Sequence, residues 1–273
     1  MRVTQMAAPL GAIVEDIDIR VIEGDGDSVK DEDVNLSTWQ KLNQLFCQYH
    51  VLVFRNQDLQ PDDHIAFARR WGELVKFPYG GLEDHPDIIE LKNRGKSSDV
   101  NQHWHTDMSY NQAPPKLTML YAHAAPEFGG DTAFSNQHLA YQDLSEGLKA
   151  TLQNTTAFHT ASGLARLYGQ DEAAAPKATH PVLRSHDESG DPALYVCRAF
   201  TRNFTGWSRE ESKPLLDYLF SHSTSMEYQA RHHWQAGDLV MWDNRSVLHY
   251  AVHDHGDDER VIHRLQVVGE STL

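Results

Sequence analysis

The spacing of apolar and polar positions divides the first third of the chain into strands and helices. Residues 11–19, GAIVEDIDI, alternate between apolar and polar side chains, which predicts a strand with one buried face. Residues 35–50 repeat apolar side chains at helical spacing and predict an amphipathic helix. The apolar run VLVFR at 51–55 predicts a short buried strand, and residues 60–74 predict a second helix with Pro61 in its first turn.

Strands dominate the pattern of the remaining chain. Further helices are predicted at 144–152 and 208–223. Short runs of strand character lie at 116–126, 131–136, 193–197, 227–234, 237–244, 246–252 and 260–268. Helices early and many short strands late predict an α+β fold with a barrel or sandwich core. Because no repeat, low-complexity tract or long Gly/Ser linker interrupts the sequence, a single domain over residues 1–273 is expected.

Charge and cysteine content narrow the class of protein. The formal net charge of -15 disfavours nucleic-acid binding, which needs a basic surface, and disfavours docking on an anionic membrane. An anionic small-molecule substrate must therefore be bound by local positive charges. Cys47 and Cys197 form no CxxC pattern, which is typical of reduced thiols in the cytoplasm. With no apolar run of membrane-spanning length and no signal-peptide core, we expect a cytoplasmic enzyme or binding protein.

The segment HWHTDMSY, residues 103–110, places two imidazoles and a carboxylate close together in the chain. In an extended segment alternate side chains share a face, so His105 and Asp107 would point the same way while Thr106 points away. A neutral imidazole beside a carboxylate can present two ligands to a divalent cation. The spacing alone also fits an ordinary surface pair, because His-x-Asp is a common chance pattern.

His249 lies inside the mainly apolar run VMWDNRSVLHYAV, residues 240–252. By itself, a histidine in such a strand also fits a satisfied core residue. Together with His105 and Asp107 it completes two histidines and one carboxylate, the set that holds Fe(II) on one face and leaves positions open. Open positions indicate chemistry, because structural metal sites are closed. On this interpretation His105 and Asp107 hold iron and His103 does not.

The run ERVIHRLQVV, residues 259–268, carries two arginines in a predicted strand. Arg260 and Arg264 would face the same side, roughly 13 Å apart along the strand. Such arginines are costly unless each meets an anion, and pairing with the chain's many Asp and Glu residues is the alternative. Beside an Fe(II) centre, a 2-oxo acid can chelate the metal through its carboxylate and keto oxygens and leave one position for O2. Arg260 is the candidate that binds the far carboxylate of that acid.

Taken in order, His-x-Asp, GGDT, WDNRSVLHYA and a following Arg make the chain similar to the taurine and phenoxyacetate dioxygenase family. Members of this family are Fe(II)/2-oxoglutarate-dependent oxygenases. The resemblance runs from PLGAIVEDIDI to IHRLQVVGE, nearly the whole chain. It implies a double-stranded β-helix, or jelly roll, with flanking helices. It also implies a homo-oligomer that hydroxylates a small anionic organic acid and releases succinate and CO2.

The resemblance also assigns roles to individual residues. The site residues of the family correspond to the iron ligands His105, Asp107 and His249, the 2-oxoglutarate residues Thr132 and Arg260, and the substrate residues Arg264 and Asn101. Where taurine enzymes carry a substrate histidine, this chain has Phe77 or Lys76, and Val100 replaces an acidic residue that would meet the amine of taurine. Both departures indicate a substrate more apolar than taurine. The candidates for lining its pocket are Phe77, Tyr79, Tyr110, Phe200 and Phe204.

Two other functions fit part of the pattern. A non-catalytic jelly-roll protein that binds or senses a metal would use the same three ligands, but it has no need of paired arginines. A metal-dependent hydrolase would hold Zn²⁺ with the triad and a water, although zinc prefers sets richer in His or Cys. Within the oxygenases, the presence of Asp107 favours hydroxylation, because halogenating relatives leave the carboxylate position empty for chloride.

Overall fold

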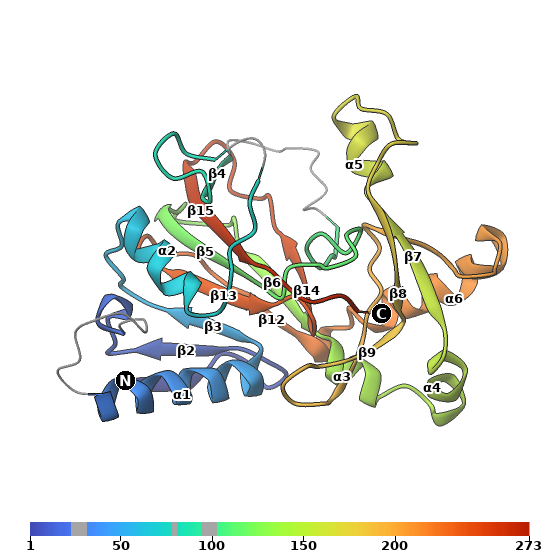
Figure 1. The fold of residues 1–273 in the computed structure, drawn as a ribbon, viewed down its shortest axis with the longest axis horizontal. Helices are drawn as coiled ribbons and strands as arrows, with labels where there is room; N and C mark the ends of the chain where they lie inside the picture. Colours follow the sequence, from blue (N-terminus) through green and yellow to red (C-terminus); the bar gives the residue numbers. More distant parts are fainter. Residues whose placement is uncertain (23–31, 78–80, 94–102, 273) are drawn as a thin grey trace.

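The computed structural model describes residues 1–22, 32–77, 81–93 and 103–272 (Figure 1). The mixture of helices and strands confirms the α+β class. The α-helices are α1 (Glu32–Tyr49), α2 (Pro61–Arg69), α3 (Gln137–Gln142), α4 (Glu146–Leu152), α5 (Ser162–Leu167) and α6 (Arg209–His222). The strands are β1 (Arg2–Gln5), β2 (Ala12–Glu15), β3 (Val51–Phe54), β4 (Ile89–Asn93), β5 (Leu117–Ala124), β6 (Thr132–Asn136), β7 (Thr156–Thr160), β8 (Lys177–Pro181), β9 (Leu183–Ser185), β10 (Pro192–Leu194), β11 (Thr201–Phe204), β12 (Gln229–His232), β13 (Leu239–Asp243), β14 (Val247–Ala251) and β15 (Arg260–Val267). Within the described ranges, no helix is both long and apolar enough to cross a bilayer.

Seven strands form the major sheet, in the order β1-β2-β3-β13-β5-β15-β4. Neighbouring strands are antiparallel except β2 and β3, which run parallel. Successive side chains point to opposite faces, so Leu239 and Met241 of β13 lie on one face while Val240 and Trp242 lie on the other. The two faces therefore bury separate cores.

The first core lies between the major sheet and the two N-terminal helices. Leu42 and Phe46 of α1 and Phe67 of α2 pack in one cluster with Phe54 of β3. Figure 1 shows both helices beside the strands of this sheet. The apolar stripe predicted from the helical spacing of residues 35–50 is the face that α1 buries.

The second core lies between the major sheet and a minor sheet of three strands, in the order β12-β6-β14. Phe134 of β6 and Val247 of β14 pack with Val240 and Ile262 of the major sheet. The register of the minor sheet pairs His249 with Phe134. This pairing places the predicted ligand of β14 beside the second core.

Residues 137–228 form a lobe beside the two sheets, and it contains β7–β11 and α3–α6 (Figure 1). Strands β11-β7-β8 make one small sheet, and β9 and β10 pair as a hairpin. The helix predicted at 208–223 is α6, which begins after a capping box between Ser208 and Glu211. The apolar core of the lobe includes Leu144, Leu152, Val182, Leu194, Phe204, Leu216 and Leu219.

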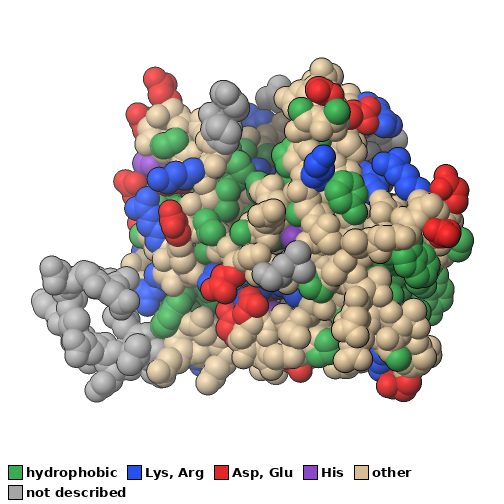
Figure 2. Space-filling model, turned by 45° about the vertical axis from the view of Figure 1, so that its right-hand side comes forward, with side chains coloured by type: hydrophobic (Ala, Val, Ile, Leu, Met, Phe, Trp, Pro, Cys, Tyr) green, Lys and Arg blue, Asp and Glu red, His purple; other side chains and the backbone are tan. Residues whose placement is uncertain are grey.

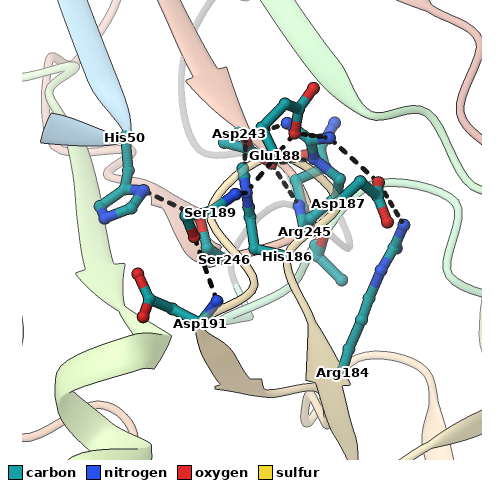
Figure 3. Close-up of polar contacts among 12 residues, drawn as sticks. His50, Arg184, His186, Asp187, Glu188, Ser189, Asp191, Asp243, Arg245 and Ser246 are labelled. Atoms are coloured by element: carbon teal, nitrogen blue, oxygen red, sulfur yellow. Dashed lines mark hydrogen bonds and ion pairs between the residues drawn. The ribbon is translucent and has the colours of Figure 1, made fainter. Parts of the chain in front are cut away.

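A charge network joins the lobe to the major sheet (Figure 3), and it is buried at His186, Asp243 and Arg245 but exposed at Asp187 and Glu188. The loop of the β9–β10 hairpin brings Asp187 and Glu188 to the guanidinium of Arg245, in the turn after β13. Arg245 also pairs with Asp243, whose carboxylate accepts a further hydrogen bond from His186 at 2.9 Å. The network therefore holds the turn after β13 against the lobe.

Three predicted elements end three or more residues earlier than expected. The strand predicted at 193–197 ends with β10 at Leu194. The strand predicted at 11–19 stops at Glu15, because Asp16 adopts a φ of 55° and interrupts the extended backbone. The helix predicted at 60–74 ends with α2, and Gly72 follows with a φ of 142°, a value that a right-handed helix excludes.

Candidate metal centre

His105, Asp107 and His249 converge beside the second core. Each offers a ligand atom, and these atoms all lie within 4.8 Å of one another. The Nε2 atoms of His105 and His249 lie 3.8 and 3.6 Å from Oδ1 of Asp107. Ligands bonded at about 2 Å to one cation are separated by at most roughly 4 Å, so Asp107 lies close enough to each histidine to share an ion with it. Within the part of the chain that the structure describes, no other group of three His, Cys, Asp or Glu side chains meets this way.

Backbone pairing holds the two histidines side by side. The amide of His105 donates to the carbonyl of His249 at 3.0 Å and the reverse bond measures 2.8 Å, so the pair forms an isolated antiparallel bridge. Directly opposed residues of such a bridge project to the same face, and the ring centroids lie 4.0 Å apart. Nδ1 of His105 lies 2.8 Å from the carbonyl oxygen of His103, and donation there leaves Nε2 as the lone-pair atom toward the site. His103 contributes its backbone, and its own ring is exposed.

The extended conformation, on which a shared face for His105 and Asp107 would depend, ends at Thr106. The next four residues form a turn, in which Met108 adopts a φ of 49°. The physical reason is a long-range contact: Oγ1 of Thr106 donates to the carbonyl oxygen of Asn244 at 2.6 Å and ties the segment to the turn after β13. Asp107 therefore reaches the site from a turn and not through strand alternation.

Burial and neighbouring charges control ionisation at the site. Burial, followed by the nearby His105 ring, lowers the pKa of His249 to about 3. Burial opposes ionisation of Asp107, but the imidazoles of His249 and His105 hold its pKa below the ordinary value. At neutral pH a neutral His249 thus faces an ionised Asp107, and these are the protonation states that metal ligands require.

A cavity opens next to the three ligands. Its other lining residues are Leu91, Leu120, Thr132, Trp242, Ala251, Arg260 and Arg264. Apolar walls with a few polar and charged groups are typical of small-molecule sites. Figure 2 shows the molecule hollowed between the part with the sheets and the part with the lobe, with hydrophobic side chains along the hollow.

Arg260 and Thr132 share Trp234 as a neighbour. The indole Nε1 of Trp234 donates to Oγ1 of Thr132 at 3.0 Å, and its ring centroid lies 5.6 Å from the guanidinium carbon of Arg260. Thr132 keeps its own proton for donation elsewhere. Burial lowers the pKa of Arg260 to about 10, so the side chain remains a cation at neutral pH. Among the described residues no carboxylate pairs with Arg260, and its buried Nε has no hydrogen-bond partner there.

The GGDT turn places Thr132 at the start of β6. Gly129 and Gly130 have φ values of 72° and 67°, which favour glycine. The amide of Gly130 donates to Oδ1 of Asp254 at 2.8 Å, and a Cβ on Gly129 would lie 2.4 Å from the same oxygen. The two glycines are thus needed by the backbone of the turn.

Arg264 lines the same cavity as Arg260, four positions further along β15. Its guanidinium carbon lies 5.3 Å from the ring centroid of Phe77, whereas Lys76, the alternative at this position, is exposed. The alternative in which both arginines form ion pairs with the chain's own carboxylates is not seen in the described ranges.

None of the described aromatic residues predicted to line the substrate pocket belongs to the lining of the cavity, although Phe77 and Phe200 lie beside Arg264 and His105, which do. The rings of Tyr110 and Phe200 meet edge to face at 5.0 Å, and the ring of Phe200 lies 6.1 Å from that of His105. Phe204 instead belongs to the apolar core of the lobe. Tyr79, Val100 and Asn101 lie outside the described residues.

Comparison with known families decides the class. The family described as "Taurine catabolism dioxygenase TauD, TfdA family" matches residues 16–266. The chain belongs to this family. The dioxygenase class expected from the order of the motifs is thereby confirmed.

Individual relatives of this TauD/TfdA family member cover most of its length. It is 34% identical over 254 residues to an alkylsulfatase of Acinetobacter baylyi, across 88% of the chain and 80% of the relative. It is 36% identical over 229 residues to an alpha-ketoglutarate-dependent 2,4-dichlorophenoxyacetate dioxygenase of Burkholderia sp., across 74% of the chain and 76% of the relative. The crystal structure of a putative alpha-ketoglutarate-dependent taurine dioxygenase from Burkholderia xenovorans matches with a TM-score of 0.83 and 29% identity, across 98% of this chain and 93% of that one.

Three buried polar residues that support Asp107 were not predicted from the sequence, namely Thr118, Asn244 and Gln266. Oγ1 of Thr118 donates to Oδ2 of Asp107 at 2.6 Å, and it accepts from Asn244 and Gln266. The available signal was a polar side chain at an inward position, because Thr118 lies two positions before the buried Leu120 on β5 and therefore shares its face. A buried hydroxyl in an apolar strand needs partners, but the sequence does not say which.

Proposed function

We propose that this TauD/TfdA family member is an Fe(II)/2-oxoglutarate-dependent dioxygenase. It hydroxylates a small anionic organic acid with O2 and releases succinate and CO2. The proposal depends on one observation, the meeting of the His-Asp-His triad and the two arginines on a single cavity. The names of relatives support it, since those from Burkholderia sp. and Pseudomonas putida are alpha-ketoglutarate-dependent dioxygenases of 2,4-dichlorophenoxyacetate and of sulfate esters.

The triad supplies the donor set that Fe(II) oxygenases use. His105, Asp107 and His249 would hold the iron, which supplies O2 activation with electrons from the oxidative decarboxylation of 2-oxoglutarate. Three protein ligands leave room for the two chelating oxygens of 2-oxoglutarate and for O2. The contribution of the protein is to orient these groups at short range.

Thr132 and Arg260 would bind the C5 carboxylate of 2-oxoglutarate. The hydroxyl proton of Thr132 and the N–H fork of Arg260 are charge-assisted donors for such a group. Because Trp234 contacts both side chains, they need little reordering when the ligand arrives. Burial of Arg260 also strengthens its attraction to an anion.

Arg264 would bind the anionic group of the primary substrate, with Phe77 stacked on its guanidinium. The apolar side chains of Leu91, Leu120 and Trp242 in the same cavity favour a substrate body more apolar than taurine. Sulfonates, aryloxyalkanoates and related carboxylates are therefore the candidates. Asn101 stays a predicted substrate residue on the strength of the resemblance alone.

We also propose that the major and minor sheets form the double-stranded β-helix of a single domain over residues 1–273. Support comes from the second core, which the two sheets bury between them, and from the charge network that ties the lobe to the turn after β13. The homo-oligomer and the cytoplasmic location stay predictions.

The two arginines also argue against the alternatives. A non-catalytic metal-binding or sensor protein gains nothing from cations buried beside its metal, because burial of an unpaired guanidinium is unfavourable. A metal-dependent hydrolase of a single monoacid would leave one of the two arginines without an anion. The oxygenase needs both, one for each acid.

Anaerobic titration of the protein with Fe(II) and 2-oxoglutarate tests the proposal. We expect the weak visible charge-transfer band of the chelated complex, and we expect His105→Ala to abolish it. His103→Ala is the matched control, since it removes a neighbouring exposed imidazole and leaves the backbone carbonyl that His105 contacts. Retention of the band in His105→Ala would contradict the ligand assignment.

A substrate panel then tests the role of Arg264. Sulfonates, aryloxyalkanoates and other small acids are scored by succinate formation with the wild type and with Arg264→Ala. We expect the variant to keep the charge-transfer band and to lose substrate-dependent turnover. Loss of the band together with turnover would instead place Arg264 at the 2-oxoglutarate site.

A further inference from the structure

The two carboxylate oxygens of Asp107 face different neighbours. Oδ1 faces the Nε2 atoms of both histidines, at 3.8 and 3.6 Å. Oδ2 accepts a hydrogen bond of 2.6 Å from Oγ1 of Thr118, which lies on β5 and is fully buried. The two oxygens therefore have separate partners.

The direction of the Thr118 hydrogen bond is determined by its other partners. A hydroxyl has one proton and two acceptor positions. Nδ2 of Asn244 and Nε2 of Gln266 donate to Oγ1 of Thr118, at 2.9 and 3.0 Å, so the single proton is left for Asp107. Exchanging the positions of the Asn244 side-chain oxygen and nitrogen would break the hydrogen bond that its Oδ1 accepts from the indole N–H of Trp242 at 3.0 Å, because that N–H can only donate.

The support for Asp107 comes from the major sheet and not from its own segment. Thr118 lies on β5, Gln266 on β15, and Asn244 in the turn after β13, and all three are buried. Asp107 itself lies in a turn, where no strand ladder restrains its side chain. The hydroxyl of Thr118 is thus the contact through which the rigid sheet orients a turn residue.

We propose that Thr118 is a positioning residue that keeps Asp107 a one-oxygen ligand. A carboxylate can bind a cation through one oxygen or through both. With Oδ2 held by Thr118, the second oxygen would stay off the iron and leave its coordination position to 2-oxoglutarate. This inference rests on the proposed function, but it adds a residue and a task that the three ligands alone do not imply.

Anaerobic binding of Co(II) to the whole protein tests the proposal without turnover. Thr118→Val removes the hydroxyl at nearly constant volume, and we expect Co(II) affinity to fall about 10- to 100-fold, as for other losses of a ligand's hydrogen-bond partner. We also expect the visible d–d bands of bound Co(II) to change, because their intensity depends on coordination number. Binding of 2-oxoglutarate to the Co(II)-loaded variant should weaken as well.

Two variants separate positioning from a general effect on structure. Thr118→Ser keeps the hydroxyl and should restore both the affinity and the wild-type spectrum. Thr160→Val is the matched control, because Thr160 is also buried at the end of a strand and its hydroxyl accepts one backbone hydrogen bond, in the lobe. We expect wild-type Co(II) binding from it.

The outcomes distinguish this inference from the metal assignment beneath it. Wild-type affinity and spectrum in folded Thr118→Val would overturn the role of Thr118 and leave the triad intact. Co(II) binding that survives His105→Ala would overturn the triad itself. If Thr118→Val fails to fold, Thr118→Ala takes its place. Weaker Co(II) binding or an altered Co(II) spectrum in Thr118→Ala would support the proposal, whereas wild-type affinity together with a wild-type spectrum would overturn it.

Discussion

Asp243 and Arg245, two residues apart in the turn after β13, form a buried ion pair with two contacts. Nε of Arg245 lies 2.9 Å from Oδ1 of Asp243, and Nη2 lies 2.6 Å from Oδ2 (Figure 3). Burial opposes ionisation of Asp243, but Arg245 and His186 hold its pKa well below the ordinary value. Asn244 lies between the two partners, so the pair also holds the turn that supports Thr118.

Arg245→Met should destabilise the protein strongly. The substitution leaves Asp243 as a buried carboxylate without its main partner, and such losses cost about 3–5 kcal/mol. Urea unfolding followed by circular dichroism measures the change in the free energy of unfolding. Arg166→Met is the control, because the exposed pair of Arg166 with Glu172 should contribute little. Equal effects of the two substitutions would contradict the role of the buried Asp243–Arg245 pair.

Acidification should destabilise the protein through His64. Burial, with smaller effects of His263 and His123, lowers the pKa of His64 to about 3, and neither ring nitrogen has a hydrogen-bond partner among the described residues. Between its ordinary value of 6.5 and about 3 the unfolded chain binds the proton and the folded chain does not. The free energy of unfolding should therefore fall as the pH falls through this range.

The variant His64→Leu isolates that contribution. One such group accounts for about 2 kcal/mol between pH 7.5 and pH 5, at about 1.4 kcal/mol per pH unit. Urea unfolding measures the free energy of unfolding at both pH values. From pH 7.5 to pH 5 we expect this free energy to fall by about 2 kcal/mol less in His64→Leu than in the wild type. Parallel pH profiles for the two proteins would show that His64 does not titrate as its burial implies.

Thr132→Val should weaken 2-oxoglutarate binding while leaving the metal in place. Because Trp234 already donates to Thr132, the hydroxyl proton is the one that a carboxylate in the cavity would receive. A hydrogen bond to a charged group contributes about 1.5–3 kcal/mol, so the dissociation constant should rise about tenfold or more. Titration of the anaerobic charge-transfer band measures it, and Thr132→Ser should stay close to the wild type. An unchanged constant in Thr132→Val would remove Thr132 from the site.

Phe77→Leu should affect the primary substrate and not 2-oxoglutarate. The ring centroid of Phe77 lies 5.3 Å from the guanidinium carbon of the half-buried Arg264, and a partly exposed cation–π contact contributes about 0.5–1 kcal/mol. We expect KM for the primary substrate to rise about two- to fivefold with kcat little changed. The 2-oxoglutarate titration serves as the internal control. A change confined to 2-oxoglutarate binding would reverse the assignment of the two arginines.

Local patterns predicted those features that depend on neighbours within one segment. The alternation of a strand was enough to place Arg260 and Arg264 on one face, and both line the cavity. Helical spacing predicted the buried stripe of α1, and the apolar run at 51–55 predicted β3. These features follow from backbone geometry, which is the same wherever the segment lies in the fold.

Other features depended on segments far apart in the chain. Strand alternation gave the wrong reason for Asp107 to face the site, because residues 107–110 form a turn. The hydrogen bond between Thr106 and Asn244 draws the backbone out of the extended conformation. The choice between Lys76 and Phe77 also needed the position of Arg264 in space.

The sequence by itself determined which side chains are available: two imidazoles, one carboxylate and two arginines in runs of strand character. Only the tertiary structure decided that they share one cavity, and that a hydroxyl on β5 holds the carboxylate in place. The physical reason is that side-chain direction within a strand follows from local geometry. Which strands meet, and which buried polar groups become partners, follows from packing and hydrogen bonds between distant segments.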